Sequence, residues 1–174
     1  LGVPNLGQEF LPDHLKYLAT YFRKRPMNVF FPVSVTGATV AMLLLIQAAG
    51  LNILTDPVWS ARASPVRFAG PLRVTAPGIA FDDLPRIDAV LLSHSHYDHC
   101  DVATLRRLHE RDAPLIVTPL GNDVIVHRHI GMARIVSGDW GAQFEIGGGA
   151  EVHIVPANHW SSRRLSDRRM ALWS

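Results

Sequence analysis

Cysteine is nearly absent from this sequence. Cys100 is the single cysteine among 174 residues. One thiol cannot close an internal disulfide or supply a cysteine-rich zinc site, so disulfide-stapled folds and zinc fingers are excluded. Such sparing use of cysteine is typical of proteins in a reducing compartment. We therefore expect a cytoplasmic protein, with association at a membrane as the alternative.

Long hydrophobic runs are also missing. The longest, Ala38 to Ala49, contains Thr39 and Gln47 and is shorter than the about 20 residues that a membrane-spanning helix needs. We predict core strand there. A strong excess of charge is absent too: the formal net charge of +2 gives no reason to expect a nucleic-acid partner. With 48% hydrophobic and 18% charged residues, the chain is predicted to be globular.

The first residues differ in pattern from the rest. Residues 9–22 carry apolar side chains at mostly helical spacing, and the basic run Arg23-Lys24-Arg25 and Pro26 follow them. This predicts a helical or extended segment over residues 1–28 that docks on its own domain. Contact with an anionic membrane surface is the alternative. Residues 29–174 are predicted to form one domain.

The domain is predicted to have α/β architecture, because a β-meander is followed by alternating strands and helices. A Pro- and Gly-rich excursion from Trp59 to Asp83 lies between the meander and the strand that begins at Ile87, and loops of that length are usually functional. Asp101 is expected to cap the helix that follows it. The predicted strands are Val29–Thr36, Thr39–Gln47, Leu51–Thr55, Ile87–Ser93, Leu115–Thr118, 134–137 and 150–156, and the predicted helices run from Asp101 to about Glu110 and from Asn122 to His129.

The most informative motif follows the apolar strand at Ile87. It places three imidazoles and one carboxylate within six residues, in the order His94, His96, Asp98, His99. His94 and His96 project to one side of an extended chain, and the other two approach after a turn, which favours two adjacent metal ions over one closed structural site. A zincin helix is excluded because its histidines lie four apart. A histidine-rich surface loop is the alternative interpretation.

A second histidine follows a later predicted strand, in the sequence Pro156-Ala157-Asn158-His159. Because strand ends gather at one edge of an α/β sheet, His159 is the best distant candidate for a metal ligand. The remaining histidines His109, His127, His129 and His153 fit helix surfaces or strand faces, so ordinary structural or exposed roles are expected for them.

These residues resemble the metallo-β-lactamase superfamily, and more closely its branch that contains N-acyl phosphatidylethanolamine-hydrolysing phospholipase D. The resemblance implies an αββα sandwich, of which this chain holds only the first half or so. It rests on the HxHxDH motif and on further segments between Val29 and Trp173, which are Leu54-Thr55-Asp56-Pro57, Trp59-Ser60, Arg62-Ala63-Ser64-Pro65, Gly70-Pro71, Leu84-Pro85-x-Ile87-Asp88-Ala89-Val90, and Asn158-His159-Trp160 with the arginines after it and Asp167.

The resemblance also implies a ligand set. By position, His94, His96 and His159 resemble the ligands of one metal ion, and Asp98 and His99 resemble ligands of a second. Two zinc ions are expected, although imidazole and carboxylate also suit iron or manganese. Asp56 resembles the family aspartate that orients a ligand imidazole from behind the metal loop.

The implied function is a metal-dependent hydrolase that uses a metal-bound hydroxide, most nearly a phosphodiesterase of the phospholipase D type acting on N-acyl phosphatidylethanolamine-like lipids. Asp98 is the candidate catalytic residue, through a second metal ion or as a proton acceptor. Arg163, Arg164 and Trp160 are candidates for binding substrate, against the alternatives of a solvated charged face and simple packing.

Two departures from the family keep other functions open. The segment Thr36-Gly37-Ala38-Thr39 lacks the histidine that usually follows that glycine, and the family continues beyond Ala171-Leu172-Trp173 to further ligands. The chain is therefore expected to be part of a longer polypeptide or to pair with another chain that completes the site. The competing functions are hydrolysis of another ester, lactone or amide, and a non-catalytic metal-binding or lipid-binding fragment.

Overall fold

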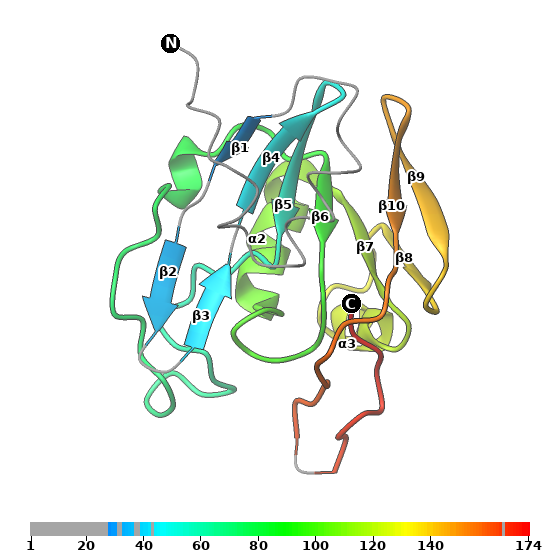
Figure 1. Ribbon diagram of the computed structural model, residues 1–174. Helices are drawn as coiled ribbons and strands as arrows, with labels where there is room; N and C mark the ends of the chain where they lie inside the picture. Colours follow the sequence, from blue (N-terminus) through cyan, green and yellow to red (C-terminus); the bar gives the residue numbers. More distant parts are fainter. Residues whose placement is uncertain (1–27, 31–32, 37–38, 43, 165) are drawn as a thin grey trace.

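The computed structural model describes residues 28–30, 33–36, 39–42, 44–164 and 166–174. Its main feature is a six-stranded sheet in the order β1-β4-β5-β6-β7-β8, accompanied by the two-stranded hairpins β2-β3 and β9-β10 (Figure 1). The strands are β1 (Asn28–Phe30), β2 (Val33–Thr36), β3 (Thr39–Met42), β4 (Leu44–Ala48), β5 (Leu51–Thr55), β6 (Ala89–Leu91), β7 (Leu115–Pro119), β8 (Ile135–Gly138), β9 (Gln143–Gly147) and β10 (Ala150–His153), and the helices are η2 (Phe81–Asp83), α2 (Val102–Asp112) and α3 (Asn122–His129).

The sheet changes from antiparallel to parallel at β5. Strand β4 pairs antiparallel with both β1 and β5, whereas β5, β6, β7 and β8 run parallel to one another. Parallel pairing requires crossovers: the long excursion with η2 joins β5 to β6, α2 joins β6 to β7, and α3 joins β7 to β8. The carboxyl ends of β5 and β6 therefore lie side by side at one edge of the sheet, where α/β folds place their binding sites.

Both faces of the sheet are buried. On one face, Leu105 and Leu108 of α2 pack with residues such as Leu54, Val90 and Ile116 of the strands. The opposite face carries a second cluster, formed by Leu44, Ile46, Ala48, Ile53 and Ala89, against which Ile146 of β9 packs. Burial on both faces explains why β4 and β6 are almost continuously apolar.

The predicted α/β class is confirmed, and so are helix α3 at its predicted limits and the cap at Asp101. The described residues supply one helix layer and one main sheet of the expected sandwich. The predicted helix within residues 9–22 and the position of Ala38 lie outside the described residues. Among the helices that are described, none is long and apolar enough to cross a bilayer.

The predicted strands were wrong in four places. The two long strands predicted between residues 29 and 47 are four short ones, and β2-β3 is a hairpin apart from the main sheet. Strand β9 was missed, although its alternating Phe144 and Ile146 and the glycines after it are typical of a hairpin strand. Strand β10 ends at His153, three residues before Pro156, so His159 lies on a loop and not at a strand end. Strand β6 is also shorter than predicted, since it spans Ala89–Leu91.

The amino end of α2 is held by the buried carboxylate of Asp101. It caps the helix by accepting from the backbone amide of Ala103 at 3.1 Å, and it accepts from the Thr104 hydroxyl at 2.6 Å. The same carboxylate accepts from the backbone amides of Trp59 and Ser60 and from the Ser60 hydroxyl, at 3.2, 2.9 and 2.9 Å. One side chain thus joins the start of the long excursion to the helix that follows the histidine motif.

Replacing this carboxylate should destabilise the fold. Asp101→Ala leaves several buried donors unpaired, so we expect the free energy of unfolding to fall by about 3 kcal/mol in urea denaturation. Asp82→Ala is the control, because the Asp82 side chain is 94% exposed and only faces Arg107 at 3.8 Å. Equal effects of the two variants would contradict the assignment of Asp101 as a structural hub.

Candidate metal centre

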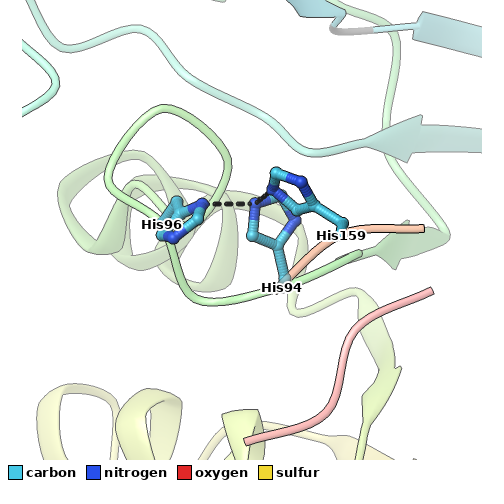
Figure 2. Close-up of side chains that lie close together, drawn as sticks. All are labelled: His94, His96 and His159. Carbon is cyan, nitrogen blue, oxygen red and sulfur yellow. Dashed lines mark hydrogen bonds between the residues drawn. The ribbon is translucent and has the colours of Figure 1, made fainter. Parts of the chain in front are cut away.

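Three imidazoles converge where the chain leaves β6. After Leu91 the chain turns through residues 93–100, and the backbone amides of His99 and Cys100 donate to the carbonyl of His96 before α2 begins. Figure 2 shows the rings of His94, His96 and His159 grouped together, with His159 arriving from the distant loop after β10. Nε2 of His94 lies 2.9 Å from Nδ1 of His96 and 3.1 Å from Nε2 of His159.

The hydrogen bonds behind His94 fix which ring nitrogen faces the cluster. The Ser93 hydroxyl lies 2.6 Å from Oδ2 of Asp56 and 2.8 Å from Nδ1 of His94. A carboxylate can only accept, so the hydroxyl donates to Asp56 and its lone pair accepts from Nδ1–H of His94. The proton of His94 is thereby held on Nδ1, and the lone pair of Nε2 points at His96 and His159.

Asp56 holds the loop at two further points. Its Oδ1 accepts from the backbone amide of Ser93 at 2.7 Å, and its Oδ2 lies 2.8 Å from Nδ1 of His99. The latter contact makes Nδ1 of His99 a donor and leaves Nε2 on the far side of the ring, 3.7 Å from the carboxylate of Asp98. Asp98 and His99 therefore form a pair of adjacent donors beside the three-imidazole cluster.

The geometry of the cluster fits a metal ion. The ligand atoms of His94, His96 and His159 all lie within 4.8 Å of one another. Nitrogen atoms bound to zinc at 2.0–2.1 Å in a tetrahedron would be separated by about 3.3 Å, close to the two separations given above. Nε2 of His96 is buried and, within the described part of the chain, has no hydrogen-bond partner, so Nδ1 is the nitrogen that this ring offers.

The pKa shifts of the three clustered imidazoles also favour metal binding. Burial, the largest cause, and the neighbouring imidazoles His99, His96 and His159 together lower the pKa of His94 to about 2. Desolvation also lowers the pKa values of His96 and His159. Unprotonated imidazoles are the form that binds metal, so the cluster is prepared for an ion near neutral pH.

The pKa values of His99 and Cys100 are raised, unlike those of the three clustered imidazoles. Burial lowers the pKa of His99, but the hydrogen bond to Asp56 and the charges of Asp56 and Asp98 outweigh it and leave the pKa raised. Cys100 is fully buried in the core, and burial raises the pKa of its thiol to about 11. The thiol therefore stays protonated and gives no thiolate ligand.

The loop that carries His159 is tied to the histidine motif by two residues. The buried hydroxyls of Ser161 and Ser95 lie 2.6 Å apart. Nη1 of Arg163 donates to the carbonyls of Ser95 and Cys100 at 3.0 and 2.7 Å, and its guanidinium lies 4.0 Å from the ring centre of Tyr97. These contacts hold the two ligand-bearing segments together.

Arg163 is itself held by the turn that follows it. The Asp167 carboxylate accepts from the Ser162 hydroxyl and from the backbone amides of Arg163 and Arg164, at 3.0, 2.8 and 2.7 Å. These roles could not be predicted from the sequence, because a run of arginines gives no sign of which one turns back onto backbone carbonyls. The small polar residues Ser95 and Ser161 were the only local signal.

The other predicted substrate residues lie at the rim of the cluster. Trp160 is 37% exposed and packs edge-on against His96, with ring centres 4.4 Å apart. The guanidinium of Arg168 lies 4.9 Å from the centre of the Trp160 ring, and Arg164 is exposed. Substrate binding by Arg163, Arg164 and Trp160 stays a prediction, as does the assignment of His94, His96, Asp98, His99 and His159 as ligands with Asp56 behind them.

Comparison with protein families decides the fold family. The model of the beta-lactamase superfamily domain matches residues 51–174, which include all the site residues described above. This chain belongs to the metallo-β-lactamase superfamily. A second model, of a family described as a protein of unknown function, matches residues 1–57, so the two matches meet at β5.

Individual relatives support the same family. An uncharacterized protein of Mycobacterium tuberculosis is 38% identical over 131 residues, which are 75% of this chain and 35% of that protein. An N-acyl-phosphatidylethanolamine-hydrolyzing phospholipase D of Caenorhabditis elegans is 34% identical over 139 residues, and the match covers 75% of this chain and 39% of that enzyme. The chain thus spans little more than a third of the length of the curated relatives it matches.

A solved structure supports the fold. Igni18, described as a metallo hydrolase from the archaeon Ignicoccus hospitalis, matches with a TM-score of 0.52 and 15% identity, over 78% of this chain and 51% of that one. This likeness agrees with the fold of the superfamily, and the histidine cluster is where a metal ion fits.

Zinc binding by the cluster should depend weakly on pH. Three imidazoles with an ordinary pKa of about 6.5 would lose roughly 50-fold in zinc affinity between about pH 7.5 and pH 6, because protons compete for the same lone pairs. Since the pKa values of His94, His96 and His159 are lowered, we expect a loss below about tenfold. Titration against a competing chelator at both pH values measures this, and a 50-fold loss would contradict it.

Removing the side chain of Arg163 should loosen the centre. We expect Arg163→Ala to weaken zinc binding by about tenfold, as is usual when a group that positions a ligand is lost. Arg163→Lys should recover only part of this, because one ammonium cannot reach both carbonyls and stack on Tyr97.

Arg164→Ala is the matched control, since it removes the same charge one residue away from an exposed side chain. The visible spectrum of the cobalt-substituted protein should change for Arg163→Ala and not for Arg164→Ala. Equal effects of the two variants would mean that only the charge of this segment matters.

Proposed function

We propose that the protein is a metal-dependent phosphodiesterase of the phospholipase D type, acting on N-acyl phosphatidylethanolamine-like lipids. The observation that carries the proposal is the convergence of Nε2 of His94, Nδ1 of His96 and Nε2 of His159 beside the pair Asp98 and His99. Similarity to the Caenorhabditis elegans enzyme supports the choice of lipid. Because the chain spans only part of such relatives, the activity is proposed for the protein as a whole.

The reaction would be hydrolysis of the bond between phosphorus and the ethanolamine oxygen. The oxygen of water forms a new bond to phosphorus, the ethanolamine oxygen leaves with its bonding electrons and takes up a proton, and phosphatidic acid and an N-acylethanolamine result. Divalent ions in such a site would act as Lewis acids and lower the pKa of water, so that a nucleophile exists near neutral pH. We assign zinc, in one or two equivalents, as the expected metal.

The chain's own residues would divide the work by position. His94, His96 and His159 would hold one ion through the nitrogens that already converge, and Asp98 and His99 would hold the second. The carboxylate of Asp98 lies beside the cluster, 3.7 Å from Nε2 of His99, so it is the candidate acceptor for a proton from water. Asp56 would keep Ser93 and His99 in place throughout.

The rim residues would contact the lipid. Trp160 offers an exposed aromatic surface next to His96, and the guanidinium of Arg168 stacked on it can meet a phosphate oxygen. Arg164 offers a second exposed cation in the same turn. Arg163 has Nη1 occupied by two carbonyls, so we assign it first to positioning and only secondarily to the substrate.

The test is hydrolysis of N-acyl phosphatidylethanolamine in detergent micelles by the zinc-loaded protein, with products identified by mass spectrometry. In water enriched in oxygen-18 the label should enter phosphatidic acid, because attack occurs at phosphorus. His96→Ala and Asp98→Ala should each reduce turnover by at least about a thousandfold. His127→Ala, on the exposed surface of α3, should leave turnover unchanged.

The competing functions give different results. Hydrolysis of a lactone, carboxylic ester or amide without attack on the phosphodiester would replace the proposed substrate class and keep the metallo-hydrolase. One bound zinc with no turnover on any of these substrates would favour the non-catalytic metal-binding alternative.

A further inference from the structure

The excursion between β5 and β6 has an unusual charge pattern. Residues 57–81 contain Arg62, Arg67 and Arg73 and not one aspartate or glutamate. Acidic residues flank the segment on both sides: Asp56 before it bonds His99, and of Asp82 and Asp83 after it, Asp82 faces Arg107 of α2 at 3.8 Å. Arg73 interacts with the carboxylate of Asp101, so Arg62 and Arg67, nearer the tip, are the charges that give the loop a field that attracts anions.

The excursion is an ordered loop with a defined tip. At its base the backbone amide of Ala63 donates to the carbonyl of Pro71 at 3.1 Å, and that of Arg73 donates to the carbonyl of Ala61 at 2.8 Å. Nη1 of Arg62 donates to the carbonyl of Gly70 at 2.7 Å across the loop. Residues 64–70 are thus presented as a closed tip on a short two-stranded stem.

The base of the excursion is anchored beside the histidine motif. The backbone amides of Trp59 and Ser60 donate to the carboxylate of Asp101 at 3.2 and 2.9 Å, and Nη2 of Arg73 donates to the carbonyl of Val58 at 2.7 Å. The loop starts directly after Asp56, whose carboxylate holds Ser93 and His99. The base of the loop therefore lies at the same edge of the sheet as the histidine cluster.

The loop exposes apolar side chains of a kind that is normally buried in a folded protein. Phe68 at the tip is 85% exposed, and Val74, Leu72 and Val66 are 66%, 54% and 37% exposed. A single exposed apolar residue needs no explanation, but four on one short loop between arginines form an apolar surface with a basic margin. That combination is typical of segments that enter the interface of an anionic bilayer.

We propose that residues 62–74 are a docking loop for an anionic phospholipid surface. Phe68 and Val66 would enter the boundary between headgroups and acyl chains, while Arg67 and its neighbours would lie at the level of the lipid phosphates. The charge of the loop selects this occupant, since an apolar protein partner would not require a loop free of acidic residues. The proposal rests on the proposed function in one respect: a lipid substrate would be met at such a surface.

The test is partition onto vesicles of phosphatidylcholine with and without phosphatidylglycerol, measured by co-sedimentation without added substrate. Anionic vesicles should bind the protein at least about tenfold more strongly, since each arginine near such a surface contributes about fivefold. Phe68→Ser should weaken binding by about tenfold or more, and Arg67→Glu should remove most of the preference for anionic lipid.

Matched controls come from another surface. Met132→Ser removes a side chain that is 87% exposed in the turn between α3 and β8, and Arg128→Glu reverses an exposed charge on α3. Both should bind vesicles like the unaltered protein. Equal loss in Phe68→Ser and Met132→Ser, or equal binding to neutral and anionic vesicles, would overturn the proposal.

The outcomes separate this proposal from the proposed function. Turnover of the lipid in detergent without binding to vesicles would reject the docking loop and leave the enzyme assignment intact. Binding that depends on Phe68, without turnover of the lipid, would support the docking loop and reject the enzyme assignment. Light scattering that shows association of the protein with itself, lost in Phe68→Ser, would instead make the loop a contact between copies of the chain and overturn the proposal.

Discussion

The carboxylate of Asp56 is the constraint on which the site depends. It stands at the carboxyl end of β5 with a positive φ of 40°, a conformation that costs a residue with a side chain on the order of 1 kcal/mol. In return it joins the adjacent parallel strand end by accepting from the amide and hydroxyl of Ser93 and by bonding His99. Those contacts set the protonated nitrogen of both His94 and His99, so one backbone position decides which atoms face the candidate metal.

Two further clamps complete the arrangement from either side. Asp101 fixes the start of the long excursion to the first turn of α2, immediately after the histidine motif. Arg163 and Ser161 fix the loop of His159 to the backbone of the motif from the opposite direction. The histidines themselves make few contacts that serve the fold, which leaves their lone pairs available. The protein stabilises the loops around the cluster so that the cluster can remain poor in hydrogen bonds.

Much of this centre could be predicted from the sequence, for a definite reason. The four candidate ligands His94, His96, Asp98 and His99 are close in sequence and follow an apolar strand, so local pattern alone brought them together. Asp56 was reached through family resemblance. His159 was first predicted because it follows a predicted strand, and its placement at a strand end was wrong because β10 stops at His153. The role of Arg163 depends on a return of the chain onto carbonyls far away in sequence, which no local pattern encodes.

The fold, like the site, has parts that local sequence pattern predicts and parts that tertiary contacts decide. The α/β class and helix α3 followed from periodicity, and the start of α2 followed from the cap at Asp101. The division of residues 28–48 into four strands followed from pairing partners that periodicity does not specify. Strand β9 carried its own alternating signal, but Ile146 packs onto the main sheet only because the hairpin folds back over Ile53 and Ala89. Local chemistry thus predicted which residues are candidates for the site, and tertiary contacts decide what holds them.

The central claim is that three imidazoles form one metal centre, and X-ray absorption of the protein loaded with one equivalent of zinc tests it most directly. The account predicts about three imidazole nitrogens at 2.0–2.1 Å in the first coordination sphere, with one of them lost in His159→Ala. Coordination by oxygen alone, or a spectrum unchanged by His159→Ala, would contradict it.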